Sequence, residues 1–140
     1  MQDFSQRLII VVRKDLPGWQ FANAVAHVAA YFGNKWGDTF GTGEYFESKD
    51  NVKLPRNSQY PIIIKRANGD EQLKNLFEKA KTANVQHHVF IREMIDHTSD
   101  EDLQKALDGK ALAEIEFLAL GVFGLNDDVN TLTKKFGLWE

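Results

Sequence analysis

The sequence predicts a three-layer α/β/α domain built around a mixed, mainly parallel four-stranded sheet. Apolar segments rich in β-branched residues alternate along the chain with segments whose apolar residues recur at helical spacing. Right-handed crossovers between such strands make neighbouring strands mostly parallel and place helices on both faces. The length of 140 residues fits a single domain, spanning 1–140, that is large enough to bury a core.

The first strand, loop and helix are the clearest elements. Leu8–Val12 is an unbroken apolar run, which is typical of a strand covered on both faces. Pro17 then interrupts regular structure, and Phe21–Phe32 follows with helical periodicity. Gly33 and Asn34 are expected to end this helix. Its apolar face comprises Phe21, Val25, Val28, Ala29 and Phe32.

The remaining elements repeat the alternation. Further strands are predicted at Tyr60–Lys65, His87–Ile95 and Ile115–Val122, and helices at Glu71–Ala83, after Thr98 and from Asn126. Thr98 and Glu101 have the spacing of a capping box at the start of the third helix. The glycines of Gly121–Gly124 are expected to form a tight turn, and Leu138-Trp139 to fold back on the body.

An irregular or hairpin insert is predicted at about 35–56. Tyr45–Glu47 and Val52–Leu54 flank a turn at Asp50-Asn51, which favours a short hairpin. The insert is the only segment long enough to act as a lid or partner surface. An aromatic-rich region in and before it could be buried in a homodimer contact. Its members are Phe32, Trp36, Phe40, Tyr45 and Phe46.

Composition excludes several function classes. The net charge of −3 disfavours a general nucleic-acid binder, which needs clustered positive charge. The absence of cysteine excludes disulfides, thiol catalysis and cysteine-bound metals. The longest apolar run, Leu8–Val12, falls far short of the roughly 20 residues that span a bilayer, so no membrane partner is expected. The start Met1–Phe4 lacks the layout of a signal peptide, which favours a cytoplasmic location.

A polar stripe runs down the first predicted helix. Gln20, Asn23, His27 and Tyr31 fall on one side of it at helical spacing. Helix N-termini beside the ends of sheet strands are common ligand sites, because their backbone N–H groups are free. The predicted ligand-binding set at this end is Lys14, Asp15, Trp19, Gln20 and Asn23. The alternative is that these residues are only the solvated side of an amphipathic helix.

A second polar group, Asp96-His97-Thr98, follows the third predicted strand. A carboxylate, an imidazole and a hydroxyl together can activate water. Asp96 and Thr98 from this group, together with His27 from the first helix, are the candidate catalytic residues. The alternative is that Thr98 is only a helix cap. His87 and His88 are adjacent in a strand and point to opposite faces, so they cannot readily share a metal. The sequence has no recognised metal spacing or phosphate-binding glycine motif, and no metal or cofactor is expected.

Three segments carry a resemblance to a known family. These are RLIIVVRKDLPGWQFANAVAHVAAYFG, PIIIKRA and LALGVFGLNDDVNTLTKKFGLW. They resemble, in the same order, the strand, alanine-rich helix, second strand and closing strand and helix of peptidyl-tRNA hydrolase type II. The pattern is closer still to a sister family of uncharacterised proteins, the domain of unknown function numbered two thousand. The resemblance implies a three-layer fold of the peptidyl-tRNA hydrolase II type.

The sequence departs from that hydrolase family where its signature places a lysine and a glutamine. These positions hold Gln20 and Ala24. The lysine would supply positive charge to the RNA end or to the developing oxyanion, which Gln20 cannot do. Two hypotheses follow. The chain is a divergent hydrolase of an acyl ester, or it is a non-enzymatic module that binds a small ligand or a protein in the same pocket.

Overall fold

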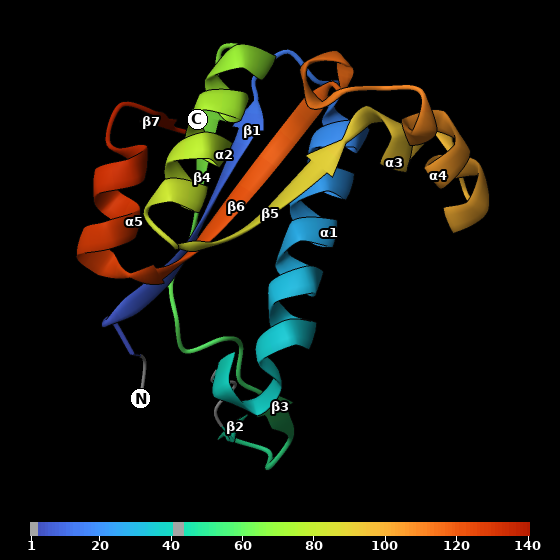
Figure 1. Cartoon of the computed structure of the whole chain (residues 1–140). Coiled ribbons are helices and arrows are strands. Elements are labelled where there is room, and N and C mark those ends of the chain that lie inside the picture. Colours follow the sequence, from blue (N-terminus) through green and yellow to red (C-terminus); the bar gives the residue numbers. More distant parts are fainter. Residues whose placement is uncertain (1–2, 41–43) are drawn as a thin grey trace.

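The computed structural model describes residues 3–40 and 44–140 and contains a five-stranded mixed sheet (Figure 1). Positions 41–43 of the predicted insert lie outside the described residues. The strands run in the order β5-β6-β1-β4-β7. Their bounds are β1 (Gln6–Arg13), β4 (Ile62–Ala67), β5 (Gln86–Ile91), β6 (Phe117–Leu125) and β7 (Gly137–Leu138).

The prediction of a mainly parallel, four-stranded sheet was wrong. Only β1 and β4 pair in parallel, whereas β1–β6, β5–β6 and β4–β7 are antiparallel. The segment between β5 and β6 explains the difference. It contains α3 (Arg92–Asp96), α4 (Asp100–Asp108) and the 3₁₀ turn η2 (Leu112–Glu114). These short helices lie beyond the end of β5 rather than across a face of the sheet, so the chain returns beside β5 in the opposite direction (Figure 1).

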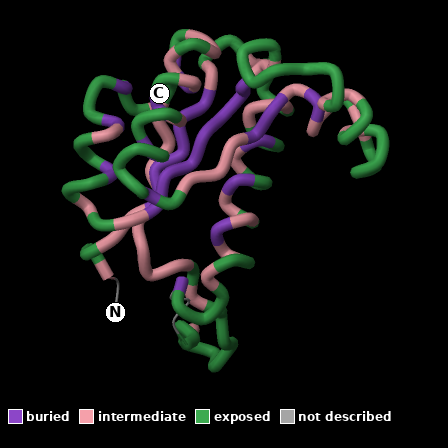
Figure 2. Tube along the Cα trace, viewed as in Figure 1, coloured by how far each residue is buried: buried purple, intermediate pink, exposed green. Residues whose placement is uncertain are grey.

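The three-layer arrangement was predicted correctly. Helix α1 (Gly18–Trp36) covers one face of the sheet, and α2 (Asp70–Thr82) and α5 (Asn126–Thr133) cover the other (Figure 1). Alternate residues of β1 point into the two cores: Leu8 and Ile10 towards α1, Ile9 and Val11 towards α2 and α5. All four are fully buried, and the central strands form the buried interior of the molecule (Figure 2).

Helix α1 is longer than predicted. It continues through Gly33 and ends at Trp36, before Gly37, whose φ of 48° is the left-handed conformation that favours glycine. An interior glycine costs a helix only about 1 kcal/mol, and Trp36 offsets it by packing on Phe123, with ring centroids 5.7 Å apart. The periodicity therefore placed the helix correctly but put its end one turn too early.

The segment after β5 corrects two predictions. The strand expected to reach Ile95 stops at Ile91, and α3 begins at Arg92. Ser99, rather than Thr98, caps α4: its Oγ accepts a hydrogen bond from the Asp102 backbone N–H at 3.1 Å. The predicted box had the right three-residue spacing but lay one residue early. Thr98 is exposed and has no capping role.

The two glycines expected to form a tight turn lie instead inside β6. Gly121 sits where α1 approaches the sheet, and a Cβ atom there would lie 2.5 Å from Val28 Cγ1 and 2.9 Å from Phe32 Cε2. Gly121 is therefore required by close packing of the helix on the strand rather than by a turn.

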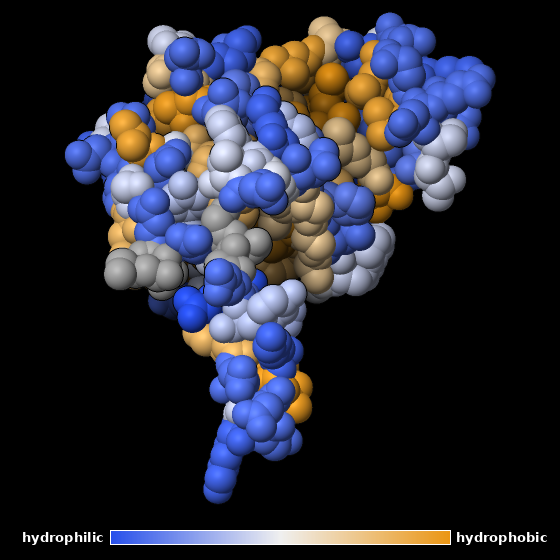
Figure 3. All heavy atoms as spheres, turned by 90° about the horizontal axis from the view of Figure 1, so that it is seen from below, coloured by the Kyte–Doolittle hydropathy of each residue, from blue (hydrophilic) through white to orange (hydrophobic). Residues whose placement is uncertain are grey.

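The predicted hairpin is present, with β2 (Tyr45–Glu47) paired to β3 (Lys53–Pro55). It follows the 3₁₀ turn η1 (Gly37–Phe40) and extends away from the sheet (Figure 1). The aromatic-rich region is divided: Phe32 and Phe40 lie in the core, whereas Tyr45 and Phe46 are more than half exposed. The molecular surface around this end mixes hydrophilic and hydrophobic residues (Figure 3).

The C-terminal segment folds back as expected. Strand β7 pairs with β4, and the Trp139 ring stacks on Phe21 with centroids 4.2 Å apart. This contact fixes the start of α1 against the opposite end of the chain. In the described residues, no helix is both long and apolar enough to cross a membrane.

Candidate functional site

A cavity of about 550 Å³ lies between α1, the end of β5 and the α3–α4 segment. We call it the histidine cavity. It is lined by His27, Ala30, Tyr31, Asn34, His88, Phe90, Met94, His97, Thr98, Ser99, Asp100 and Leu103. Its volume falls within the range of small-molecule sites.

Two ring pairs join α1 to β5 in this cavity. Tyr31 stacks on His88 with centroids 3.9 Å apart and planes 7° apart, and His27 stacks on Phe90 at 5.5 Å and 14°. Local geometry aligns the pairs. Residues four apart on a helix share a face, as do residues two apart on a strand. Flat ring surfaces from two elements are thus presented side by side.

The adjacent residue His87 points to the other face of the sheet, as the sequence predicted. Its Nδ1 lies 2.8 Å from the Val85 carbonyl oxygen, and its ring meets Phe77 of α2 edge to face. His88 and His87 therefore belong to different cores. Among the described residues, no group of three or more histidine or carboxylate side chains is placed to hold a metal ion.

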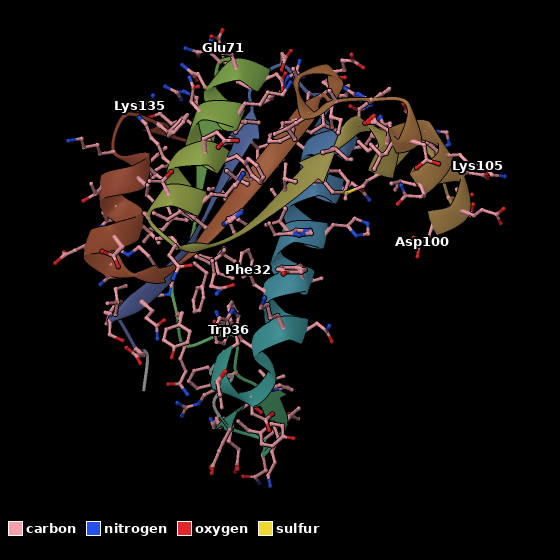
Figure 4. All side chains as sticks on the ribbon, viewed as in Figure 1. Phe32, Trp36, Glu71, Asp100, Lys105 and Lys135 are labelled. Atoms are coloured by element: carbon pink, nitrogen blue, oxygen red, sulfur yellow. The ribbon has the colours of Figure 1, made fainter. Side chains whose placement is uncertain are left out.

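The outer wall of the cavity is the α3–α4 segment. Helix α4 contains no buried residue and lies on the same side of the sheet edge as α1 (Figures 2 and 4). Asp100, at its first turn, is labelled in Figure 4. Leu103 points into the cavity one turn later. The inner wall of the cavity thus consists of stacked rings, whereas the outer wall is a helix without a buried residue.

The surroundings of His88 favour the uncharged form of its imidazole. Burial lowers the pKa of its imidazole, and the positive charges of protonated His27 and His87 lower the pKa further.

A separate group of charged residues, the arginine cluster, lies at the start of α1 and contains Arg13, Asp15, Gln20, Arg92 and Glu116. Arg13 donates two hydrogen bonds to Asp15 at 3.0 and 2.7 Å and a third to Glu116 at 2.6 Å. Arg92 donates to Glu116 at 3.1 Å and to the Gln20 side-chain oxygen at 2.8 Å. The cluster connects β1, α1, α3 and the start of β6, and its charges are already paired.

The arginine cluster makes the free energy of unfolding depend on pH in the acid range. Hydrogen bonds from Arg92 and then Arg13 hold the pKa of Glu116 below its ordinary value, and Arg13 lowers the pKa of Asp15 in the same way. A depressed carboxyl pKa stabilises the fold above the unfolded-state value, and this stabilisation is lost as pH falls through the folded-state value. We expect the free energy of unfolding to decrease below about pH 4.5.

Urea denaturation at a series of pH values tests this expectation. Glu116→Gln should flatten the decrease in stability between neutral and acid pH. Glu114→Gln, an exposed carboxyl two residues away, should leave the profile unchanged. Equal slopes for the wild type and Glu116→Gln would contradict the assignment.

Four of the eight residues predicted from the sequence lie in these two places. His27 and Thr98 both line the histidine cavity, whereas Asp96, at the end of α3, does not. Asp15 and Gln20 belong to the arginine cluster. The other three predicted ligand-binding residues are exposed and line neither the cavity nor the cluster. They are Lys14, Trp19 and Asn23.

Sequence reasoning missed most of the cavity wall. His88 was noted only as a poor metal partner, and Phe90 and Met94 were read as strand residues. One signal was present in the sequence: His27 and Tyr31 lie four residues apart on a helix, and His88 and Phe90 lie two apart on a strand. This spacing points to a shared site only when the helix and the strand are known to be in contact.

A second hollow, of about 570 Å³, lies between α2 and α5. Its lining includes Lys79, Lys134, Lys135, Leu132 and Ala83. It contains no stacked rings and no residue predicted as functional. The histidine cavity is therefore the better candidate, because rings, hydroxyls and a carboxylate converge there.

Comparison with known proteins identifies relatives but no activity. The sequence matches the family model described as Protein of unknown function (DUF2000) over residues 6–140. No curated protein matches it. Among solved structures, a protein of unknown function from Agrobacterium tumefaciens aligns with a TM-score of 0.85 and 17% sequence identity. The alignment covers 99% of this chain and 100% of that chain, which establishes a shared fold.

Proposed function

The chain belongs to the family Protein of unknown function (DUF2000), whose name assigns no activity, and we propose that it is a small-molecule-binding domain whose ligand occupies the histidine cavity. The observation that carries this proposal is the pair of ring stacks between α1 and β5, Tyr31 on His88 and His27 on Phe90, at the wall of an open cavity. Packed rings with polar tips are typical of sites that hold a flat ligand.

Binding is favoured over catalysis by what the cavity contains. Among the described residues no lysine or arginine lines it, so the wall has no permanently positive side chain to stabilise an oxyanion. The arginines closest to the start of α1 are already paired with Asp15 and Glu116. A bound ligand, by contrast, needs only apolar area and a few polar groups, which the cavity provides.

A neutral flat probe, indole-3-ethanol, tests the proposal. We expect it to shift the NMR resonances of cavity residues and to bind at least about tenfold more weakly to Ala30→Trp. Ala30 is exposed on α1 and lines the cavity, so the larger side chain fills the space without entering the core.

Ala22→Trp is the matched control. Ala22 is also exposed on α1, two turns earlier, and does not line the cavity. This variant should bind the probe like the wild type. Unchanged affinity in Ala30→Trp, or equal losses in both variants, would place the binding site elsewhere.

The second candidate function is an acyl-ester hydrolase related to peptidyl-tRNA hydrolase type II. The observation that favours it is that His27 and Thr98, an imidazole and a hydroxyl, line one cavity. Turnover of p-nitrophenyl acetate and of peptidyl-tRNA decides between the candidates. Hydrolysis above the buffer blank that is lost in His27→Ala would support the hydrolase function. Absence of turnover by folded protein would rule this function out.

We also propose that the chain forms a homodimer through the β2–β3 hairpin. Tyr45, Phe46 and Leu54 each expose more than half of their surface there, and neighbouring exposed apolar residues are typical of contact surfaces. The molar mass measured by light scattering, compared with that of a Phe46→Ser variant, tests this proposal.

A further inference from the structure

The charge distribution of the histidine cavity indicates which class of ligand it accepts. Among its lining residues, Asp100 is the only carboxylate, and no lysine or arginine contributes to the wall. The remaining polar groups are three imidazoles, a phenol, an amide and two hydroxyls. At a pH above the histidine range, Asp100 is the only formal charge in the wall.

The residues around the cavity add to its negative potential. Asp96 precedes the wall, and Asp102 lies in the same helical turn as Asp100. The two lysines of this segment are paired with other acids, Lys105 with Glu101 at 3.2 Å and Lys110 with Glu93 at 3.4 Å, and Arg92 is paired with Glu116. The rim provided by α3 and α4 is therefore acidic.

One cation lies close to the cavity. Lys35 of α1 places its Nζ 5.8 Å from the centroid of the Tyr31 ring and 3.5 Å from the Tyr31 hydroxyl. Lys35 itself does not line the cavity. Lys35 is farther from a ligand in the cavity than Asp100 is, so solvent screens its charge more strongly. Asp100 therefore attracts a cation more strongly than Lys35 attracts an anion.

The rest of the wall offers an anion no partner. Phe90 is only 2% exposed and its ring stacks on His27, so the aromatic residues contribute apolar contact, and the Met94 thioether adds a polarisable one. A phosphate or carboxylate would face ring faces and the Asp100 carboxylate without a charged partner. Such an anion would lose hydration without an ion pair in return.

We propose that the histidine cavity binds a flat aromatic ring that carries a protonated amine, and that Asp100 accepts the amine. This inference rests on the proposed function, because it specifies the ligand class of the same cavity. The ring packs against the aromatic side chains provided by α1 and β5, and the ammonium group lies at the first turn of α4. Anionic ligands, including the phosphate-bearing end of an RNA, are disfavoured in this cavity.

Three probes that share one ring and differ in charge test the proposal: tryptamine, indole-3-ethanol and indole-3-acetate. The NMR titrations are run at pH 8, above the ordinary pKa range of imidazole. We expect tryptamine to bind about twofold to fivefold more tightly than indole-3-ethanol, the range of a solvent-exposed ion pair. Indole-3-acetate should bind most weakly. Equal or tighter binding of indole-3-acetate would overturn the proposal.

Two variants locate the source of the preference. Asp100→Asn should make tryptamine and indole-3-ethanol bind equally, with the affinity for indole-3-ethanol unchanged. Asp102→Asn removes the same charge from the same turn but lies outside the cavity wall, so most of the preference should remain. If both variants lose the preference equally, the general field of α4 causes it, and Asp100 is not the amine acceptor.

The readouts separate this inference from the proposed function. Binding of indole-3-ethanol that is weakened in Ala30→Trp supports the cavity as a ligand site, whatever the relative affinities of the two charged probes. If indole-3-ethanol binds in the cavity but tryptamine binds no more tightly than indole-3-acetate, the proposed function stands and the inference fails. If none of the three probes binds at millimolar concentration, both fail.

Discussion

Gly121→Ala is expected to lower the free energy of unfolding by about 1–3 kcal/mol, although it adds only one methyl group. The added Cβ would lie 2.5 Å from Val28 Cγ1 and 2.9 Å from Phe32 Cε2, both on the buried face of α1. Neither neighbour has free space to move into, because both side chains are fully buried. Chemical denaturation by urea, followed by circular dichroism, measures the loss.

Gly33→Ala is the matched control, and the opposite sign is expected for it. Gly33 lies inside α1, and no atom lies within 4 Å of the position that its Cβ would take. Alanine there should stabilise the protein by about 0.5–1 kcal/mol, since glycine is the poorer helix former. A stabilising Gly121→Ala would show that α1 does not pack on β6 as closely as the structure indicates.

Val28→Ala tests whether the clash causes the loss. It removes the atom nearest the new Cβ, so the Gly121→Ala/Val28→Ala double variant should be less destabilised than the sum of the two single variants. Strict additivity would exclude this contact as the cause.

The close packing at Gly121 also matters for the site. Gly121 pairs with His88 across the β5–β6 ladder, so the two lie side by side under α1. Lifting α1 from the sheet would separate Tyr31 from His88, now 3.9 Å between ring centroids. Gly121→Ala is therefore expected to weaken indole-3-ethanol binding in the protein that remains folded.

Asp70→Ala is expected to lower the free energy of unfolding by about 1–3 kcal/mol. Asp70 opens α2, and its Oδ1 accepts a hydrogen bond from the Phe117 backbone N–H at 2.7 Å. Phe117 is only 1% exposed, so water cannot replace this acceptor. Loss of the ion pair with Lys74, 2.9 Å away, and of an acid at a helix N-terminus adds a smaller amount. Urea denaturation measures the effect.

Two further variants distinguish the buried hydrogen bond from the charge. Asp70→Asn keeps an acceptor oxygen and should recover most of the loss. Glu71→Ala removes an exposed acid from the same helical turn and should change stability by less than about 0.5 kcal/mol. Phe117 amide exchange should accelerate in Asp70→Ala and stay slow in Glu71→Ala. Equal destabilisation by Asp70→Ala and Glu71→Ala would contradict the assigned role.

The sequence predicted the elements better than their arrangement. β1, α2 and the hairpin lie within a few residues of their expected bounds, because periodicity and turn residues act locally. The end of α1 and the cap of α4 were misplaced because neighbouring residues offered equivalent local signals. Gly33 resembles a helix end as closely as Gly37 does, and Thr98 resembles a cap as closely as Ser99.

The candidate site was predicted only in part. His27 and Thr98 lie in the same cavity, as expected for a shared site, but Gln20 is bound to Arg92 in a different cluster. The pairing of Gln20 with Arg92 joins residues 72 positions apart, at a place where the sequence predicted a strand rather than the start of α3. A charged side chain has many partners of opposite charge along a chain, and sequence alone does not select among them.

By itself, the sequence determined the three-layer α/β architecture, the double-sided burial of β1 and the polar stripe on α1. These features follow from the order of apolar and polar residues within one strand or one helix. The tertiary structure alone decided the direction of β6, the need for glycine at position 121 and the meeting of Tyr31 with His88. Each of these depends on where distant segments come into contact, which local periodicity does not encode.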